Sequence, residues 1–256
     1  MDSVVLIKFV PDLVEDLEID PQSGLLDRSF LRLMPNELDD HALEEALLLK
    51  ERYGGTVTVI TVDTGDVDEA LYTAVAKGAD RVVKVTGEGF DQGVTDRELA
   101  SIFHEVLRGM PCELILTGTQ AVDDLDGFVG AMLAERMGLP YVGYVTKVES
   151  QDGTVIVRKE YPGGLTAEIE VATPAVLGIQ AAEKPPRYVV TSKVMEAMKS
   201  GSIDEVEAPD VSVEDGVTVS RMSVPETGAR AEMIKGSVQD VAAALARLLR
   251  DRGVIA

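Results

Sequence analysis

The chain has few of the residue types on which several classes of protein depend. Among its 256 residues there is one cysteine, Cys112, no tryptophan, and 4% aromatic residues. A single cysteine excludes an internal disulfide framework and a cysteine-based metal site. Cys112 precedes an apolar run at residues 114–116, so we expect a packed, unreactive thiol.

Long hydrophobic runs are also missing. No apolar stretch approaches the ~20 residues that a membrane-spanning helix requires. The first residues, Met-Asp-Ser-Val-Val-Leu-Ile-Lys, lack the basic lead and cleavage site of a signal peptide. We therefore expect a soluble, cytoplasmic protein.

Basic residues are scarce. There are 24 Lys and Arg against 45 Asp and Glu, which gives a net charge of −21. This balance opposes sequence-independent binding to nucleic acid, which requires Lys and Arg to neutralise phosphates, and it opposes binding to anionic membranes. It fits either basic partner surfaces or a high-salt host. The two histidines, His41 and His104, have no second His or Cys nearby, so we predict structural positions for both and no metal site.

What the sequence does contain is an alternation of apolar strands and amphipathic helices. Strands are predicted at residues 4–10, 56–62, 81–86 and 113–118. Helices are predicted to begin at Asn36, Asp66, Thr95 and about Asp126, each near a capping residue. Because parallel strands of one sheet need helical crossovers, this alternation predicts a doubly wound, mainly parallel α/β sheet.

The pattern changes after Pro140. Asp152-Gly153 is flanked by alternating residues and predicts a hairpin. Further antiparallel strands at 165–171 and 175–179 are expected either to extend the sheet or to fold over its edge. Residues 192–199 form a predicted helix, 201–216 a linker, and 237–252 a terminal helix, which packs either on a partner or on its own core. The predicted units are a nucleotide-binding domain at 1–182, a recognition segment at 183–200 and an arm with a helix at 201–256.

The central stretch is residues 113–137, where a buried strand ends at Gly118 and a polar loop leads into a helix. Open α/β sheets bind ligands at the carboxyl ends of their strands, and free N–H groups at a helix start suit a phosphate. A solvated strand-to-helix turn would show the same pattern. The lysine at the end of the first strand, Lys8, must pair, snorkel or face a ligand.

Several blocks, in order, resemble the beta subunit of the electron transfer flavoproteins, a family that includes nitrogen-fixation-associated flavoprotein subunits. They cover most of residues 1–200, and the match over the C-terminal arm is looser. The blocks lie at residues 4–12, 36–51, 74–81, 114–124, 157–164, 174–176 and 186–197. The resemblance implies a heterodimer with an alpha subunit that makes most contacts to an FAD, and a beta subunit that binds AMP or a second FAD.

The resemblance also implies site residues. The expected nucleotide contacts, at the ends of the first two strands, the first helix and the central loop, are Leu6, Ile7, Lys8, Asn36, Glu37, Leu38, Asp39, Val62, Asp63, Thr64, Gly118, Gln120, Ala121, Val122, Asp123, Asp124, Asp126, Gly127, Phe128, Val129, Gly130 and Met132. The expected partner contacts are Arg187, Tyr188, Val190, Thr191, Val194 and Met195. The resemblance implies that dehydrogenases, and an acceptor such as a quinone oxidoreductase, bind to the electron transfer flavoprotein as its redox partners.

The loop departs from the family pattern. Gly127, Phe128 and Val129 stand where relatives carry Asn or Gln and Thr, so backbone N–H groups, with help from Lys8, must hold a phosphate. The AMP, the second FAD and an empty site all remain open. In the recognition segment, Thr191 replaces an exposed Leu of relatives.

The resemblance implies an electron carrier rather than an enzyme, with the flavin supplying the redox chemistry and bifurcation left open. No arrangement of residues requires acid, base or nucleophile chemistry. The rival hypothesis is an adenine-nucleotide-binding regulator of the universal-stress type without flavin.

Overall fold

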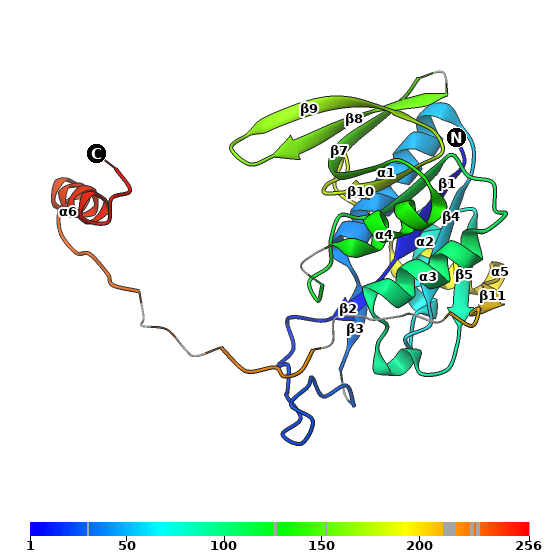
Figure 1. Ribbon diagram of the computed structural model, residues 1–256, viewed down its shortest axis with the longest axis horizontal. Coiled ribbons are helices and arrows are strands. Elements are labelled where there is room, and N and C mark those ends of the chain that lie inside the picture. The colour runs from blue at the N-terminus through cyan, green and yellow to red at the C-terminus, as the bar shows by residue number, and fades with distance from the viewer. Residues whose placement is uncertain are drawn as a thin grey trace.

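The computed structural model describes residues 1–29, 31–124, 127–151, 153–211, 219–225, 228 and 231–255. It is an α/β fold built on a nine-stranded sheet in the order β11-β5-β4-β1-β6-β10-β7-β8-β9 (Figure 1). The strands are β1 (Ser3–Ile7), β2 (Phe9–Pro11), β3 (Leu33–Pro35), β4 (Val57–Val62), β5 (Arg81–Thr86), β6 (Leu114–Gly118), β7 (Tyr141–Gln151), β8 (Thr154–Tyr161), β9 (Leu165–Ala172), β10 (Ala175–Ile179) and β11 (Asp204–Glu207).

The helices are α1 (Glu37–Tyr53), α2 (Asp68–Lys77), α3 (Asp96–Leu107), α4 (Phe128–Met137), α5 (Thr191–Ser200) and α6 (Val238–Asp251), with a 3-10 turn at Phe90–Gln92. Two apolar clusters pack on the two faces of the sheet. One contains residues of α1 and α2, and the other contains residues of α3 and α4. None of the described helices is long and apolar enough to cross a membrane.

The sheet is parallel from β11 to β7, as the alternation of strands and helices predicts. Strands β1 and β10 are buried along their whole length, which is typical of parallel strands covered on both faces. From β1 the chain builds outward to β4 and β5 on one side, and later to β6 and β10 on the other. The strand order therefore reverses between β1 and β6, which is where ligands bind in open α/β sheets.

The first predicted strand, residues 4–10, is two strands. β1 ends before Lys8, and β2 pairs antiparallel with β3 in a separate small sheet. The break has a local cause, because the N–H of Lys8 donates to Asp39 Oδ2 and its carbonyl accepts from the N–H of Asn36. These bonds replace the sheet ladder at that position. Between the two strands, an isolated antiparallel bridge joins Ile19 and Leu26.

Three further predictions are wrong. β10 is not an antiparallel extension but lies parallel between β6 and β7, whereas β7, β8 and β9 are antiparallel as expected. Asp66 does not cap α2, which starts after Val67 without a side-chain cap. The predicted linker contains β11, a parallel edge strand beside β5.

Some predictions fall partly outside the described residues, namely Asp152 of the hairpin turn and 212–216 of the linker. α3 and α6 both start with the expected capping boxes, at Thr95 with Glu98 and at Ser237 with Asp240. α6 stands apart from the rest of the molecule at the end of an extended arm (Figure 1), and none of its residues is buried.

Candidate functional site

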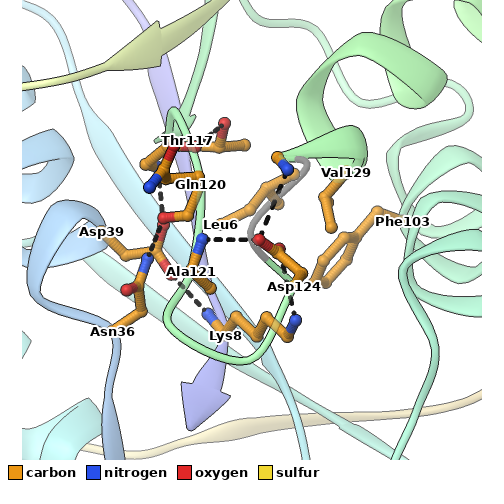
Figure 2. A pocket seen from close by; sticks show the side chains of 12 residues that line it. Leu6, Lys8, Asn36, Asp39, Phe103, Thr117, Gln120, Ala121, Asp124 and Val129 are labelled. Atoms are coloured by element: carbon orange, nitrogen blue, oxygen red, sulfur yellow. Dashed lines mark hydrogen bonds and ion pairs between the residues drawn. The ribbon is translucent and has the colours of Figure 1, made fainter. Parts of the chain in front are cut away.

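The site lies at the reversal of strand order, where β1 and β6 end side by side. Lys8 follows β1 and Gly118 closes β6, and both line one hollow of about 330 Å³ that opens to solvent. The first turn of α1 contributes Asn36 and Asp39 to the same hollow (Figure 2). Residues from three separate elements are thereby brought to one edge of the sheet.

Lys8 is the centre of a cluster of three carboxylates. Its Nζ lies 2.9 Å from Asp96 Oδ1, 2.8 Å from Asp123 Oδ1 and 3.4 Å from Asp124 Oδ2. The lysine side chain is only 12% exposed. Burial alone would lower the pKa of Lys8, but the carboxylates of Asp123 and Asp96 raise it above its ordinary value. Lys8 is therefore a fixed cation that neutralises part of the acidic loop.

Asp39 and Asn36 hold the end of β6 against the start of α1. Asp39 accepts the N–H groups of Lys8 and Gly118, at 2.8 and 2.5 Å, and Asn36 Nδ2 donates to the carbonyl of Gln120. Burial raises the pKa of Asp39 to about 7, although these two backbone donors favour its ionised form. Asn36 occupies the N-cap position of α1 as predicted, but its side chain bonds the loop rather than the helix.

Gly118 must be glycine for this arrangement. A Cβ there would lie 2.7 Å from Asp39 Oδ1 and 2.7 Å from the Cβ of Leu38. Real side chains do not tolerate such contacts, so the close approach of β6 to α1 depends on the missing side chain.

The loop after β6 is closed by Asp124. Its Oδ1 accepts the N–H of Ala121 at 2.8 Å and that of Gly127 at 3.4 Å, while Oδ2 faces Lys8 (Figure 2). α4 then begins after Gly127, which adopts a left-handed conformation and provides no side-chain cap. The first turn of α4 has no acidic residue, so its N–H groups and positive dipole end suit an anion.

A second hollow, of about 380 Å³ including the part open to solvent, lies on the other side of Lys8, which lines both. The hydroxyl of Thr64, which lines this second hollow, is buried and has no hydrogen-bond partner in the described part of the chain. Buried polar groups are normally paired. A polar ligand bound at this edge would supply the missing partner.

Many residues that the sequence predicts for the site come together at these hollows. The first is lined by the predicted residues Leu6, Lys8, Asn36, Asp39, Gly118, Gln120, Ala121, Asp124, Gly127 and Val129, and the second by Ile7, Lys8, Val62, Thr64 and Asp123. Neither hollow is lined by Glu37, Leu38, Asp63, Val122, Phe128, Gly130 or Met132. Asp126 lies outside the described residues.

Sequence reasoning missed other lining residues. They are Phe103 and Thr117 in the first hollow, and Arg28, Leu33, Thr61, Gly93, Val94 and Leu99 in the second. Thr61 and Thr117 belong to the ends of strands already predicted, so the rule that ligands bind at the carboxyl ends of parallel strands could have found them. Arg28 and Gly93 come from irregular segments that carry no comparable signal.

The predicted recognition segment is held to α1 by Arg187. Its guanidinium bonds Glu44 and Glu51, and its backbone N–H donates to Glu44 Oε2. Beyond it, Tyr188 is 86% exposed, and Val190 and Met195 are about half exposed. Thr191 begins α5 and is exposed. Val194 is only 8% exposed, so it packs inward and does not present an apolar anchor.

The remaining candidate groups are structural. The Nδ1 atom of His41 accepts the N–H of Ala182, and His104 lies beside Glu105. Burial raises the pKa of the Cys112 thiol, which keeps it protonated. Among the described residues, no group of three or more His, Cys, Asp or Glu is placed to hold a metal ion.

The fold and the edge site define a class, that of α/β proteins with a ligand site at the point where the order of parallel strands reverses. Residues 27–211 match the family described as the electron transfer flavoprotein domain. The chain belongs to this electron transfer flavoprotein family, as a relative of its beta subunits.

Full-length relatives agree. The chain is 32% identical to the electron transfer flavoprotein subunit beta of Methylophilus methylotrophus, over 98% of each chain. It is 33% identical to that of Clostridium acetobutylicum, over 100% of each chain. It is also 30% identical, over 100% of each chain, to the caffeyl-CoA reductase-Etf complex subunit CarD of Acetobacterium woodii. The family is one of electron carriers rather than of classical enzymes.

Proposed function

We propose that this chain is the beta subunit of a heterodimeric electron transfer flavoprotein and that it binds an adenine nucleotide, AMP or a second FAD, between β1 and β6. In this assignment an alpha subunit makes most contacts to the electron-carrying FAD. The complex accepts electrons from dehydrogenases and delivers them to an acceptor such as a quinone oxidoreductase. The flavin supplies the redox chemistry when bound, and the residues of this chain bind and orient.

The observation that carries the nucleotide proposal is the pair of hollows around Lys8. The first lies at the reversal of strand order and adjoins the uncapped start of α4, and the second lies at the carboxyl ends of β1 and β4. The α4 end suits a phosphate. Asp123 and Asp124 oppose a phosphate less than their charges suggest, because both pair with Lys8 and Asp124 is also bonded to the loop backbone.

Partner docking is proposed for two separate regions. The exposed side chains of Tyr188, Val190 and Met195, held in place through Arg187, form a surface for dehydrogenases. The arm and α6 dock on the alpha subunit, since α6 has no buried residue of its own. Apolar side chains at the centre of a docking surface are the usual source of binding energy.

The first experiment is co-expression with the adjacent alpha-type gene product. We expect a stable heterodimer that absorbs like a flavin, and heat or acid extraction should release FAD together with the beta-subunit nucleotide. FAD plus AMP indicates simple transfer, and two FAD per heterodimer make bifurcation possible. FAD alone would disprove the nucleotide proposal, and a colourless chain without a partner would disprove the assignment itself.

A matched pair of variants tests the position of the nucleotide. Among the described residues, two buried hydroxyls have no hydrogen-bond partner, that of Thr64 in the second hollow and that of Ser3 at the amino end of β1. Thr64→Val should lower nucleotide affinity roughly 5- to 10-fold, the worth of one hydrogen bond of about 1 kcal/mol. Ser3→Ala should leave it unchanged. The affinities are measured by calorimetric titration of the stripped heterodimers with AMP. Equal affinities of the two variants would show that Thr64 does not contact the nucleotide.

A further inference from the structure

The second hollow is lined by both apolar and polar residues. Half of its lining residues are aliphatic or aromatic, namely Ile7, Phe9, Leu33, Val62, Val94 and Leu99. The polar ones are Lys8 and Asp123, which pair with each other, Thr61, Arg28, and Thr64, whose hydroxyl has no partner in the described part of the chain. Such a lining suits an organic ring with polar edge atoms, because apolar side chains bury the ring and placed polar groups bond its edge.

Arg28 lies in an unusual environment for this chain. It belongs to the irregular segment between β2 and β3, and its side chain is half-buried. Its guanidinium forms no hydrogen bond or ion pair within the described part of the chain. Asp123 lines the same hollow but pairs with Lys8. In a protein with 45 acidic residues, a half-buried arginine without a carboxylate partner requires an explanation.

Gly93 makes room for this guanidinium. A Cβ at Gly93 would lie 2.7 Å from Cζ and 2.7 Å from Nη2 of Arg28. Arg28 therefore packs directly over the backbone of Gly93, at the edge of the hollow. This contact places the planar group against a glycine without using any of its hydrogen-bond donors.

We infer that the second hollow takes the purine base of the nucleotide and that Arg28 stacks on the base as a clamp. The inference rests on the proposed function, because it assigns a part of the same nucleotide to the second hollow. A guanidinium is flat and weakly hydrated, and it stacks on aromatic faces. The walls bury the base, and the Thr64 hydroxyl is placed to meet its polar edge. Arg28 is thus a specificity residue of the nucleotide site.

A phosphate in this hollow is disfavoured by the adjoining helix. α3 begins beside the hollow, where Val94 and Leu99 line it, but a complete capping box of Thr95 and Glu98 occupies the N–H groups of these two residues. Asp96 and Glu98 add negative charge to its first turn, which opposes an anion. The start of α4 has neither a cap nor an acidic residue, so the phosphate belongs in the first hollow and the base in the second.

The test uses the heterodimer after its nucleotide is stripped, titrated by calorimetry with AMP, adenosine and ribose 5-phosphate. AMP is a part of FAD, so the test is independent of which ligand is native. Arg28→Ala should lower the affinity for AMP and the affinity for adenosine by the same factor, about 2- to 30-fold for a stacked cation. Ribose 5-phosphate, which has no base, should bind equally to both proteins. Arg28→Lys keeps the charge without the plane and should recover only part of the loss.

A second pair of variants moves Arg28 without removing it. Gly93→Ala places a methyl group against the guanidinium, whereas Gly89→Ala meets no atom within 4 Å. Both glycines have positive φ, 104° and 79°, so both variants add backbone strain and only the first displaces Arg28. We expect weaker AMP and adenosine binding for Gly93→Ala alone.

Three outcomes would overturn the clamp. The first is that Arg28→Ala binds all three probes with unchanged affinity. The second is that Arg28→Ala binds AMP and ribose 5-phosphate more weakly but adenosine equally well. The third is that Gly93→Ala and Gly89→Ala change the affinities by the same factor. The second outcome would make Arg28 a phosphate ligand. In the first two cases the proposed function stands, because the unmodified heterodimer still binds AMP. If the unmodified stripped heterodimer binds none of the probes, the clamp and the nucleotide site fail together.

Discussion

Lys8 is the residue on which both the local backbone and the charge of the site depend. Its main-chain groups leave the β1 ladder to bond Asn36 and Asp39, and its ammonium group pairs with three carboxylates. Asp96 and Asp124 are largely buried partners, with side chains 16% and 7% exposed. Buried charges are stable only when they are paired, so removal of Lys8 should be costly.

Lys8→Met should lower the free energy of unfolding by about 3–5 kcal/mol, since it leaves buried carboxylates without a cation. Lys84→Met is a matched control, because Lys84 is equally buried and also pairs with three carboxylates, but these are more exposed. Exposed pairs contribute only about 0–1 kcal/mol each. Denaturant unfolding of both variants measures the two free energies of unfolding, and we expect the larger loss for Lys8→Met.

The pH dependence provides a second check on Lys8. Burial already raises the pKa of Asp96, and Lys8 opposes this rise. Without the cation the folded-state pKa of Asp96 is higher still, and a protonated carboxyl no longer needs a partner. Lys8→Met should therefore regain stability as the pH falls from 7 towards 5. Losses of the same size in Lys8→Met and Lys84→Met at all pH values would contradict this account.

Asp39 should make the protein less stable as the pH rises. Burial raises its folded-state pKa to about 7, whereas an unfolded Asp titrates near ~3.9. The folded state thus binds the proton more tightly, and the free energy of unfolding should fall between pH ~4 and 7 by at most ~1.4 kcal/mol per pH unit. Burial likewise raises the pKa of Glu45 to about 7, so Glu45 adds a similar slope.

Asp39→Asn removes one of these two contributions. The pH slope should drop by about half, while the loss of one acceptor for the N–H groups of Lys8 and Gly118 costs about 1–3 kcal/mol. Asp40→Asn changes the same helix at a more exposed side chain that pairs with Lys77, and its effect should be small. An unchanged slope in Asp39→Asn would show that Asp39 is ionised throughout this range.

Part of the site follows from sequence and part does not. Lys8, Asn36 and Gly118 stand where apolar runs end or a helix begins, so the edge rule for parallel sheets places them together. The partners of these residues are set by tertiary packing. The sequence gives no sign that Asp124 bonds its own loop, or that Arg28, from an irregular segment, lies on Gly93.

At the scale of elements, α1 is the helix that attaches the recognition segment to the body. Glu45 accepts the N–H groups of Val148 and Glu183, and Arg52 pairs with Glu183 through both guanidinium nitrogens. Arg187 adds its bonds to Glu44 and Glu51. The segment that leads to α5 is thus fixed by side chains rather than by sheet hydrogen bonds.

Arg187→Ala should loosen this attachment and destabilise the protein by about 3–5 kcal/mol, because it leaves the carboxylate of Glu44, 4% exposed, unpaired. Proteolysis should then cleave faster near residues 183–190. Arg81→Ala breaks a pair with Asp204 in which both side chains are about half exposed, and it should cost under about 1 kcal/mol. Similar costs and unchanged cleavage would show that Glu44 does not depend on Arg187.

The elements that sequence reasoning placed wrongly share a cause. β10 follows two antiparallel strands, yet its buried, apolar residues fill the gap between β6 and β7 in parallel orientation. β11 is short and acidic and has every sign of a linker, but Arg81 and Lys84 of β5 pair with Asp204 and Glu205. Both positions depend on strands far away in sequence, which periodicity cannot report.

For the whole molecule, the arm divides the chain into a packed body and an unattached end. Residues 219–225 still contact the body, where the N–H of Met222 donates to the carbonyl of Gly24. α6 has no such support, since none of its residues is buried (Figure 1). Its capping box satisfies the helix start but supplies no packing. Most helical stability in proteins comes from packing of an apolar face, so α6 requires a partner surface.

Leu249→Asp tests this requirement in the full chain. The substitution puts a charge on the apolar side of α6, which contains Leu245 and Leu248, and it should weaken the heterodimer by 10-fold or more, a cost of about 1.4 kcal/mol. Ala243→Asp, at an exposed position on the same helix, adds an equal charge and should have little effect. Sedimentation of the two co-expressed complexes measures the difference. The melting temperature of the isolated chain should stay within ~2 °C in both variants, because no buried contact is lost. A fall in the melting temperature for Leu249→Asp alone would instead place the apolar side of α6 on the chain's own body.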